Sequence, residues 1–302
     1  MSAEPAPGSG MRGWQRWLQA PHTLPLRRLL FQVHLWLGIG LGLYILLLSL
    51  TGSAVVLRPQ FSRWFVQNEV VSTQGEKLEG SALAEKIASV YPGFTVKRVA
   101  PATRGKRATY VALEHNGIES TRYFDQYSGL DLGPTYPWQV ADMEWLVSLH
   151  DELLLGRAGK TVNGFGGLLM LVMLVTGVVL WWQGKRSWQQ GLVIRSKSSR
   201  GIWWQLHSFT GFWAIFLLFV WGITSVYFAW PEPFDAVMDW LDDNPEDGER
   251  PDSWLLFLIR MHFGRFRDAL WANILWMILG LVPALLYMSG FIIWYRRVLK
   301  KL

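Results

Sequence analysis

The chain of 302 residues contains no cysteine. This absence excludes disulfide bonds, iron–sulfur clusters ligated by cysteine and haem attached through thioether bonds. It leaves histidine as the main candidate metal ligand, and the chain has six histidines. Charged residues are also scarce, at 17% of the chain, whereas 51% of the residues are hydrophobic and 19 are tryptophan. That composition argues against a set of soluble domains.

Charge is absent altogether from four long stretches, residues 31–57, 162–182, 202–230 and 269–295, which contain no Asp, Glu, Lys or Arg. Each stretch exceeds the roughly 20 residues that a helix needs to cross a hydrocarbon core about 30 Å thick. Because backbone groups cannot be left unpaired in lipid, we predict that each of these uninterrupted stretches spans the membrane as a helix. The first is too long for the core of a signal peptide and no small-residue cleavage site follows it, so we expect it to be retained.

The basic residues are concentrated at the ends of these stretches that would share one side of the membrane. Segments 1–30, 183–201 and 296–302 hold 13 of the 29 basic residues and only one of the 23 acidic residues. Cytoplasmic loops collect Lys and Arg, so we expect both termini in the cytoplasm. The isoelectric point of 9.6 is then a consequence of topology, and no nucleic-acid partner is needed to explain it.

The predicted fold is an α-helical membrane protein whose four transmembrane helices form two repeated hairpins, with an α+β domain inserted outside the membrane. The expected segments are a cytoplasmic N-terminal segment (1–28), the first transmembrane helix (29–58), the external domain (59–145, core about 70–138), an interfacial segment with the second transmembrane helix (146–182), a basic cytoplasmic loop (183–201), the third transmembrane helix (202–230), an acidic external loop with an interfacial helix (231–268), the fourth transmembrane helix (269–295) and a cytoplasmic tail (296–302).

The external region contains the signals of a small soluble domain. Residues 81–91 have the apolar spacing of a helix, and Pro92-Gly93 would end it. Short runs with strand character follow at 95–100, 108–115 and 120–124, separated by a turn after His115 and closed by a turn at 125–129. We predict a helix packed on a small antiparallel sheet, and we place His115 in its hairpin as solvent-facing rather than as a ligand.

Four of the histidines lie at matched positions in two copies of one pattern. His34 and His207 are each followed by glycine after four positions (Gly38, Gly211) and by threonine after 17 positions (Thr51, Thr224). His150 and His262 are followed after 26 or 27 positions by Thr176-Gly177 and Ser289-Gly290. The chain therefore repeats, and histidines held in register suggest a bound metal cofactor.

The spacing of the histidines shows where the external domain was inserted. His34 and His150 are 116 positions apart, whereas His207 and His262 are 55 apart. The difference of 61 residues is about the size of the domain, so the domain interrupts the first of two similar hairpins. Parallel repeats place equivalent residues around an axis along the membrane normal. We therefore expect His34 to pair with His207 near the cytoplasmic face, and His150 with His262 near the outer face.

Two histidines that face each other across a helical bundle can hold a b-type haem by both axial positions. We predict two bis-histidine b-type haems, with His34 and His207 as the iron ligands of one and His150 and His262 as those of the other. The glycines Gly38 and Gly211 would leave room for the macrocycle. A zinc or copper site would normally need three or four ligands, and the spans contain no carboxylate or cysteine. The alternative stays open that the histidines only join helices by hydrogen bonds.

Two haems stacked through the bilayer would connect a cytoplasmic electron donor with an acceptor outside. The glycine-rich stretches 38–42 and 164–167 follow no strand, so we predict no nucleotide site. A flavoprotein, a ferredoxin or a quinol must then supply the electrons. An acidic donor could dock on the basic loop, but positive-inside topology explains the loop without a partner and is the interpretation that we favour; its cations are Lys185, Arg186, Arg195, Lys197 and Arg200.

Other charges lie close to His150 and His262 in the sequence. Haem propionates could pair with cations there, with interfacial anchoring as the alternative; the charged residues are Asp151, Arg157 and Lys160 in one copy and Arg260, Arg265 and Arg267 in the other. Residues 232–252 hold nine acidic residues and one arginine. We interpret them as a solvated outer loop, and attraction of a cationic metal species is the alternative.

These motifs together resemble the PepSY-associated transmembrane family of bacterial inner-membrane proteins, which includes haem-containing ferric-siderophore reductases. The matching pieces are His34-x3-Gly38 leading to Leu50-Thr51-Gly52, Leu149-His150 leading through Gly156 and Gly159 to Thr176-Gly177 and Trp181, His207-x3-Gly211, and His262 leading to Ser289-Gly290. The inserted domain resembles a PepSY domain. The resemblance extends from about residue 28 to 297. Thr224-Ser225 and Ser289-Gly290 depart from the family's Thr-Gly pairs, whereas the histidines themselves are unchanged.

The resemblance implies an iron-regulated ferric-chelate reductase of iron uptake, with its external domain in the periplasm and a ferric siderophore as the acceptor. It does not indicate which residues bind the chelate. Two other functions remain open. One is a membrane-anchored binding or regulatory protein whose PepSY domain engages another envelope protein without redox activity. The other is a metal permease, and the lack of carboxylates within the spans counts against it.

Overall fold

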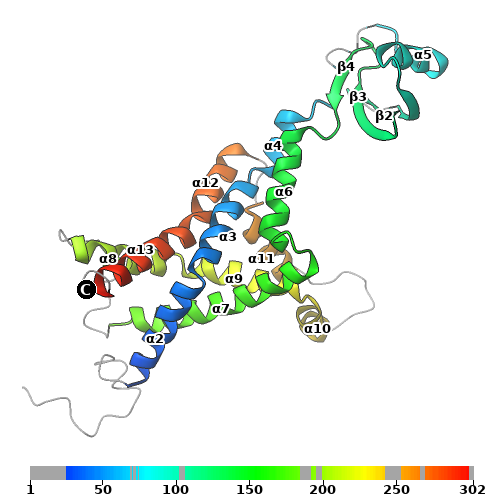
Figure 1. Ribbon diagram of the computed structural model, residues 1–302. Helices are drawn as coiled ribbons and strands as arrows, with labels where there is room; N and C mark the ends of the chain where they lie inside the picture. The colour runs from blue at the N-terminus through cyan, green and yellow to red at the C-terminus, as the bar shows by residue number, and fades with distance from the viewer. Residues whose placement is uncertain are drawn as a thin grey trace, which may run out of the picture. The chain divides into compact units, whose positions relative to one another are not determined.

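The computed structural model describes residues 25–68, 70, 73, 75–101, 106–183, 192–194, 199–241, 253–265 and 269–298. The chain divides into two compact units, Leu57–Val147 (the domain unit) and the rest (the membrane unit), and each is described by itself. The structure confirms the predicted fold class, a mostly helical protein with a four-stranded antiparallel sheet inserted between helices (Figure 1). The N-terminal segment through residue 24, most of the basic loop and residues 242–252 of the acidic loop lie outside the described residues.

The membrane unit is built from long apolar helices and a few short ones. The helices of the candidate spans are α2 (Pro25–Gly40), α3 (Gly42–Val55), α7 (Arg157–Trp181), α8 (Ser199–Trp213), α9 (Ile215–Ala229), α12 (Leu270–Gly280) and α13 (Val282–Val298), and the other helices are the end of α6 (Trp138–Glu152), α10 (Glu232–Leu241) and α11 (Ser253–Phe263). Helix α7 and the continuous pair α12–α13 are each long and apolar enough to cross a membrane, and the bent pairs α2–α3 and α8–α9 bring the number of spans to as many as four. The chain is a multi-pass membrane protein.

Two of the spans are bent, at positions that correspond in the two repeats. Helices α2 and α3 meet at Leu41 with a bend of 59°, and α8 and α9 meet at Ala214 with a bend of 63°. Each bend follows the first histidine of its repeat by seven positions. Backbone hydrogen bonds continue across both, from the Ile45 N–H to the Leu41 oxygen (2.8 Å) and from the Leu218 N–H to the Ala214 oxygen (2.9 Å). The sequence did not predict these bends, because hydropathy measures length and polarity but not curvature.

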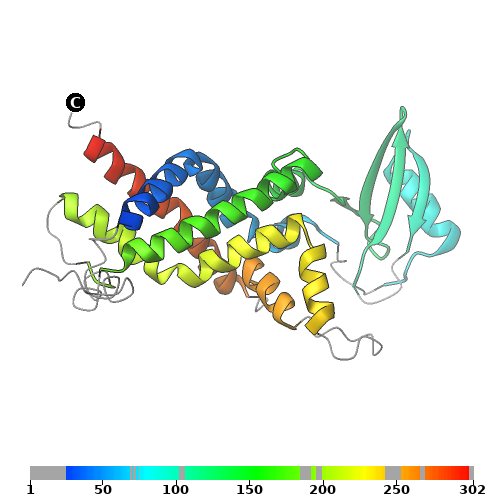
Figure 2. The ribbon, with the colours of Figure 1, turned by 90° about the horizontal axis from the view of Figure 1, so that it is seen from below.

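The helices pack in a pattern that is the same for both repeats. Within the repeats, α2 packs against α7 and α8 against α13. Between the repeats, α7 runs beside α9 (Figure 2), and α3 packs against both α12 and α13. Each first span thus contacts the second span of its own copy with one half and the second span of the other copy with its other half. This arrangement is what two hairpins related by a two-fold axis produce.

A serine side chain from the first repeat is inserted into a helix of the second. The Ser49 hydroxyl donates to the Gly280 oxygen at 2.6 Å and accepts the Ala284 N–H at 3.1 Å. In a regular helix that N–H would bond directly to the oxygen of Gly280, four residues earlier. Pro283 lacks an N–H and interrupts the helical ladder at the same place. Ser49 therefore satisfies both backbone groups at the break between α12 and α13.

An arginine joins α2 to α7 at the other end of the spans of the first repeat. The guanidinium of Arg27 in α2 donates to backbone oxygens at the end of α7, from Nη1 to Trp182 at 2.8 Å and from Nη2 to Leu180 at 2.5 Å. The last carbonyl groups of a helix have no partner within it, and a cation there is also favoured by the helix dipole. Arg27 therefore closes the end of α7 and holds α2 against it.

The domain unit carries one helix against a small sheet, as predicted. Its helices are α4 (Arg58–Phe65), α5 (Gly80–Val90) and the first part of α6, and its strands run in the order β1 (Thr95–Ala100), β2 (Thr109–His115), β3 (Ile118–Phe124) and β4 (Asp131–Pro134), all antiparallel. The buried core consists of Leu83, Ile87, Tyr91, Val111, Leu113 and Phe124. His115 is exposed and its Nδ1 donates to the Gly93 oxygen at 2.8 Å. This histidine fixes a turn in the domain.

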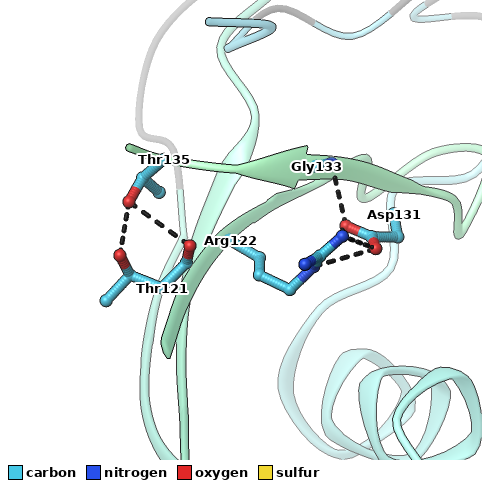
Figure 3. A network of polar contacts seen from close by, with 5 residues as sticks. All are labelled: Thr121, Arg122, Asp131, Gly133 and Thr135. Carbon is cyan, nitrogen blue, oxygen red and sulfur yellow. Dashed lines mark hydrogen bonds and ion pairs between the residues drawn. The ribbon is translucent and has the colours of Figure 1, made fainter. Parts of the chain in front are cut away.

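Strand β4 was not predicted, because Gly133 and Pro134 within it are turn residues. A polar network holds it in place (Figure 3). The Asp131 carboxylate accepts from Arg122 Nε at 2.9 Å and from the Gly133 N–H at 2.9 Å, and the hydroxyls of Thr121 and Thr135 bond to each other. Polar side chains thus add to the backbone pairing that attaches this edge strand to β3.

Candidate functional site

The first two matched histidines lie within helices and close to one another. His34 belongs to α2 and His207 to α8, and we call them the mid-helix pair. Their ring centroids are 6.3 Å apart and the ring planes cross at 84°. A single metal bonded to one nitrogen of each ring at about 2.0–2.1 Å would separate the ring centres by roughly 6 Å. The separation of these two rings therefore matches that of two imidazoles sharing one metal.

Hydrogen bonds fix the protonation of both rings in this pair. The Nδ1 atom of His34 lies 3.1 Å from the Met173 oxygen, and the Nδ1 atom of His207 lies 3.0 Å from the Leu286 oxygen. A backbone carbonyl can only accept, so each Nδ1 carries the proton. The lone pair then lies on Nε2, and no described contact of the pair uses that atom. Metal-bound histidines are commonly held in this way, with the other ring nitrogen donating to a carbonyl.

Hydroxyl groups from the same helices add a second acceptor to each ring. Thr176 Oγ1 lies 3.0 Å from His34 Nδ1, and Ser289 Oγ lies 3.0 Å from His207 Nδ1. The single hydroxyl hydrogen of Thr176 points to the Val172 oxygen at 2.8 Å, so this oxygen accepts from the histidine. Helix α7 thus orients His34 in the first repeat, and α13 orients His207 in the second.

The other two histidines lie in the last turns of short helices, and we call them the helix-end pair. His150 is in α6 and His262 in α11. The Nδ1 atom of His150 lies 3.1 Å from Thr51 Oγ1, and that of His262 lies 2.6 Å from Thr224 Oγ1. Both hydroxyls donate to a carbonyl four residues earlier in their own helix, so here too the hydroxyl accepts and Nε2 keeps its lone pair. All four histidines share one tautomer.

The helix-end pair is buried, and α6 and α11 lie outside the membrane-spanning segments. Burial lowers the pKa of His150. Burial first, and the nearby His150 second, lower the pKa of His262 to about 3. Both rings are therefore neutral at physiological pH, and a neutral imidazole is the form that binds metals.

Glycines make the space that three of the rings occupy. A Cβ atom on Gly52 would lie 2.6 Å from Cε1 of His150, and Cβ atoms on Gly177 and Gly290 would each lie 3.2 Å from Cε1 of a mid-helix histidine. In each Thr-Gly or Ser-Gly pair the hydroxyl residue binds the ring and the glycine admits it. Sequence analysis used these pairs as markers of the repeat and missed this role. In the fourth pair Ser225 packs against Gly167 of α7 instead.

Gly38 and Gly211 are less confined than these. A Cβ atom on Gly38 would meet the end of Met173 at 3.5 Å, and one on Gly211 would meet Leu286 at 3.7 Å, both ordinary contacts. Protein packing therefore does not demand glycine at either position. That leaves their predicted use, room for a macrocycle, as a prediction.

Three of the charged residues near the helix-end pair have described partners. Asp151 and Lys160 form an ion pair at 3.4 Å, and the guanidinium of Arg265 lies 4.8 Å from the centre of the Phe263 ring. Arg267 lies outside the described residues. Their pairing with propionates stays a prediction.

The nitrogen ligands that the two histidine pairs offer suit one kind of metal group better than another. Within the described part of the chain, no three residues of the types His, Cys, Asp and Glu come together as a metal site. Each place therefore offers two neutral imidazole nitrogens. Zinc sites take three or four protein ligands, whereas haem brings its own equatorial nitrogens and needs only axial ligands from the protein. The residues present fit a bis-histidine haem at the mid-helix pair, and the same ligand chemistry is present at the helix-end pair.

The fold and these paired histidines define a multi-pass helical membrane protein with repeated hairpins and an inserted α+β domain. The chain belongs to the family described as the PepSY-associated TM region, which matches residues 31–255. The matched range includes His34, His150 and His207 and stops before His262. No curated protein matches the chain.

Proposed function

We propose that this protein is a di-haem oxidoreductase of the bacterial inner membrane that passes electrons from a cytoplasmic-side donor to a ferric chelate in the periplasm. His34 and His207 would hold one b-type haem, and His150 and His262 the other. The observation that carries the proposal is the shared tautomer: every one of the four rings uses Nδ1 to donate to the protein and keeps Nε2 for a ligand.

The chain's own residues would orient the ligands and raise their basicity. A ring that donates from Nδ1 to an oxygen cannot rotate freely, and it becomes a stronger donor at Nε2. A bound haem would supply one-electron chemistry at its iron. Reducing one ferric chelate takes one electron, which the donor loses, and the ferrous product holds its ligand less tightly. The proposed donors are a flavoprotein, a ferredoxin or a quinol, and the proposed acceptor is a ferric siderophore.

The spacing along the helices supports a function across the membrane. His34 and Thr51, which binds His150, are 17 residues apart in α2–α3, and His207 and Thr224, which binds His262, are also 17 apart in α8–α9. At a rise of about 1.5 Å per residue, 17 residues follow roughly 25 Å of helix. The two pairs therefore lie at different levels of the helical bundle, and two haems would divide a distance that neither covers alone.

A spectrum of the purified protein tests this proposal directly. The oxidised protein in detergent should show a haem Soret band that shifts on addition of dithionite, with two haems per chain. Alanine at His34 or at His150 should each remove about one of the two. A preparation from cells supplied with haem that shows no haem band, or four single alanine variants with full haem content, would overturn the proposal.

A second candidate function is binding of another envelope protein through the domain unit. The observation in its favour is that this unit is compact and has a core of its own. Deletion of residues 70–138 separates the two functions. An electron conduit should keep both haems after the deletion, whereas a binding protein loses its purpose and has no haem to keep.

A further inference from the structure

The helix-end histidines, unlike the mid-helix histidines, lie where backbone carbonyl groups need hydrogen-bond partners from outside the helix. His150 and Asp151 belong to the last four residues of α6, and His262 belongs to the last four of α11. Backbone carbonyls in the last turn of a helix lack partners within it. A buried carbonyl without a partner is costly, so each of these must be bonded from outside the helix. How this is done determines how firmly the histidine itself is held.

In α6, one asparagine completes the last turn. Ser148, Leu149 and Glu152 accept backbone N–H groups from the following loop, at 3.2, 3.2 and 2.8 Å. The two remaining carbonyls, of His150 and Asp151, both accept from Nδ2 of Asn163 in α7, at 2.9 and 2.8 Å. Asn163 is buried, and Tyr44 of α3 donates its hydroxyl to Oδ1 of Asn163 at 3.0 Å. This last bond fixes the orientation of the amide, so that its NH2 group faces α6.

In α11, a tryptophan occupies the same role. Arg260 and Met261 accept backbone N–H groups at 3.0 and 3.4 Å, and the His262 oxygen accepts from Nε1 of Trp276 in α12 at 3.2 Å. Gly264, with a φ of +65°, has no side chain where the indole lies. The carbonyl of this histidine is therefore bonded by the next span, as the carbonyl of His150 is.

Asn163 and Trp276 occupy equivalent positions in the two repeats. Each lies 13 residues before the hydroxyl residue that binds a mid-helix histidine, Thr176 in one copy and Ser289 in the other. An amide and an indole have little in common except an N–H group. Two such different residues that make the same bond at the same repeat position indicate that the bond, rather than the residue, is required there.

We propose that Asn163 and Trp276 are positioning residues for the helix-end pair. By bonding the backbone of His150 and His262, they fix the last turns of α6 and α11 and so the direction of each Nε2. Thr51 and Thr224 orient the rings about that fixed backbone. The inference rests on the proposed function, because it concerns the haem that this pair would hold. It predicts that the two haems respond differently to substitutions at these positions.

The test uses the full-length protein with its haem, purified in detergent, and two readouts: the low-spin electron paramagnetic resonance signals and the midpoint potentials of the two haems. His34→Ala and His150→Ala first assign each signal to its pair. Asn163→Leu removes both N–H donors, and Trp276→Phe keeps a ring while removing the single donor. Ser49→Ala is the matched control, since it removes a buried hydrogen-bonding side chain of the same unit whose described side-chain hydrogen bonds, to Gly280 and Ala284, involve no histidine.

In both test variants we expect the signal assigned to His150 and His262 to broaden or move. Retention of that haem should fall by about tenfold or more, as for other outer-shell partners of metal ligands. The signal of the mid-helix pair should keep its position, which also shows that the variant has folded. Tyr44→Phe should have the smaller effect, because both bonds from Asn163 to α6 remain possible.

Three results would overturn the inference while leaving the proposed function intact. They are an unchanged helix-end signal in both test variants, equal changes in both haem signals, and an equal change in Ser49→Ala. A wild-type protein without haem gives a different result from all three, and it would overturn the proposed function together with this inference.

Discussion

The mid-helix and helix-end histidines are held by different means, although all four share a tautomer. His34 and His207 have backbone positions set by the continuous helices around them, and each ring bonds both a carbonyl and a hydroxyl. His150 and His262 lie where helices end, and their backbones depend on side chains from other helices. The mid-helix pair is thus positioned largely by secondary structure. The helix-end place is built by individual side chains, and single substitutions should affect it more.

The largest expected effect separates the two places completely. His207→Ala should remove the haem of the mid-helix pair and leave the other, and His262→Ala should do the reverse, because an axial ligand is lost in each case. Haem stoichiometry and the remaining resonance signal measure this. If either variant loses both haems in a folded protein, the two places are not independent and the comparison fails.

The next largest effect is expected from substitution of the glycines that leave room for the histidine rings. Gly52→Ala should displace His150, because the new methyl group would lie 2.6 Å from its ring. Gly177→Ala and Gly290→Ala bring a methyl group to 3.2 Å from a mid-helix ring, which a shift of a few tenths of an ångström relieves. We expect loss of most of the helix-end haem in the first variant and less than half of the mid-helix haem in the others. Equal losses in all three would contradict the idea that the mid-helix place is the more tolerant.

Removal of the hydroxyls should show the value of a second acceptor. His262 bonds Thr224 alone among the described contacts of its Nδ1, whereas His34 keeps the Met173 carbonyl when Thr176 is replaced. Thr224→Val therefore leaves a buried N–H unpaired, at a cost of about 1–3 kcal/mol, and Thr176→Val does not. The midpoint potential of the helix-end haem should shift more in the first variant than that of the mid-helix haem in the second. A redox titration of the two variant proteins compares these shifts in midpoint potential.

The smallest effect is expected in the domain unit, and it serves as a check on the others. Burial of Asp131 by itself would raise its pKa, but hydrogen bonds from Arg122 and from the Gly133 N–H outweigh burial and lower the pKa below its ordinary value. The stabilisation is complete above the ordinary pKa of a carboxyl and is lost as the pH falls through the lowered one.

A partly exposed ion pair of this kind contributes about 0.2–1 kcal/mol, so Arg122→Leu should loosen strand β4 slightly at neutral pH. The difference from wild type should vanish in acid. Hydrogen exchange of the backbone at Asp131–Pro134, measured on the full-length protein at both pH values, gives the comparison. Both haem signals should remain unchanged, and a change in either would mean that the domain unit influences the histidine pairs.

Much of the architecture could be predicted from hydropathy and from the repeat. The four charge-free stretches coincide with the helices that give two to four candidate spans, and the difference between the two histidine spacings indicated a domain inserted between helices. Hydropathy could not reveal the bends at Leu41 and Ala214, nor strand β4, whose composition is that of a turn. These features depend on packing and on side-chain bonds that leave no periodic pattern.

The candidate site was predicted in part for the same reason. The histidines and the Thr-Gly pairs could be found because they repeat, but the sequence does not show that Thr51 binds His150 rather than a closer histidine. Asn163 and Trp276 were missed because two unlike residues at equivalent positions do not appear as a repeat. The haems themselves, their potentials and the acceptor stay predictions.

The histidine contacts also divide cleanly between the two repeats. Thr176 binds His34 and Thr51 binds His150, all within the first repeat, while Ser289 and Thr224 bind His207 and His262 within the second. Each hairpin thus carries the residues that orient its own two histidines. Each proposed haem, however, would take one ligand from the first hairpin and one from the second. The contacts that orient each histidine are therefore contained within one repeat, and only the proposed sharing of a haem would require both repeats together.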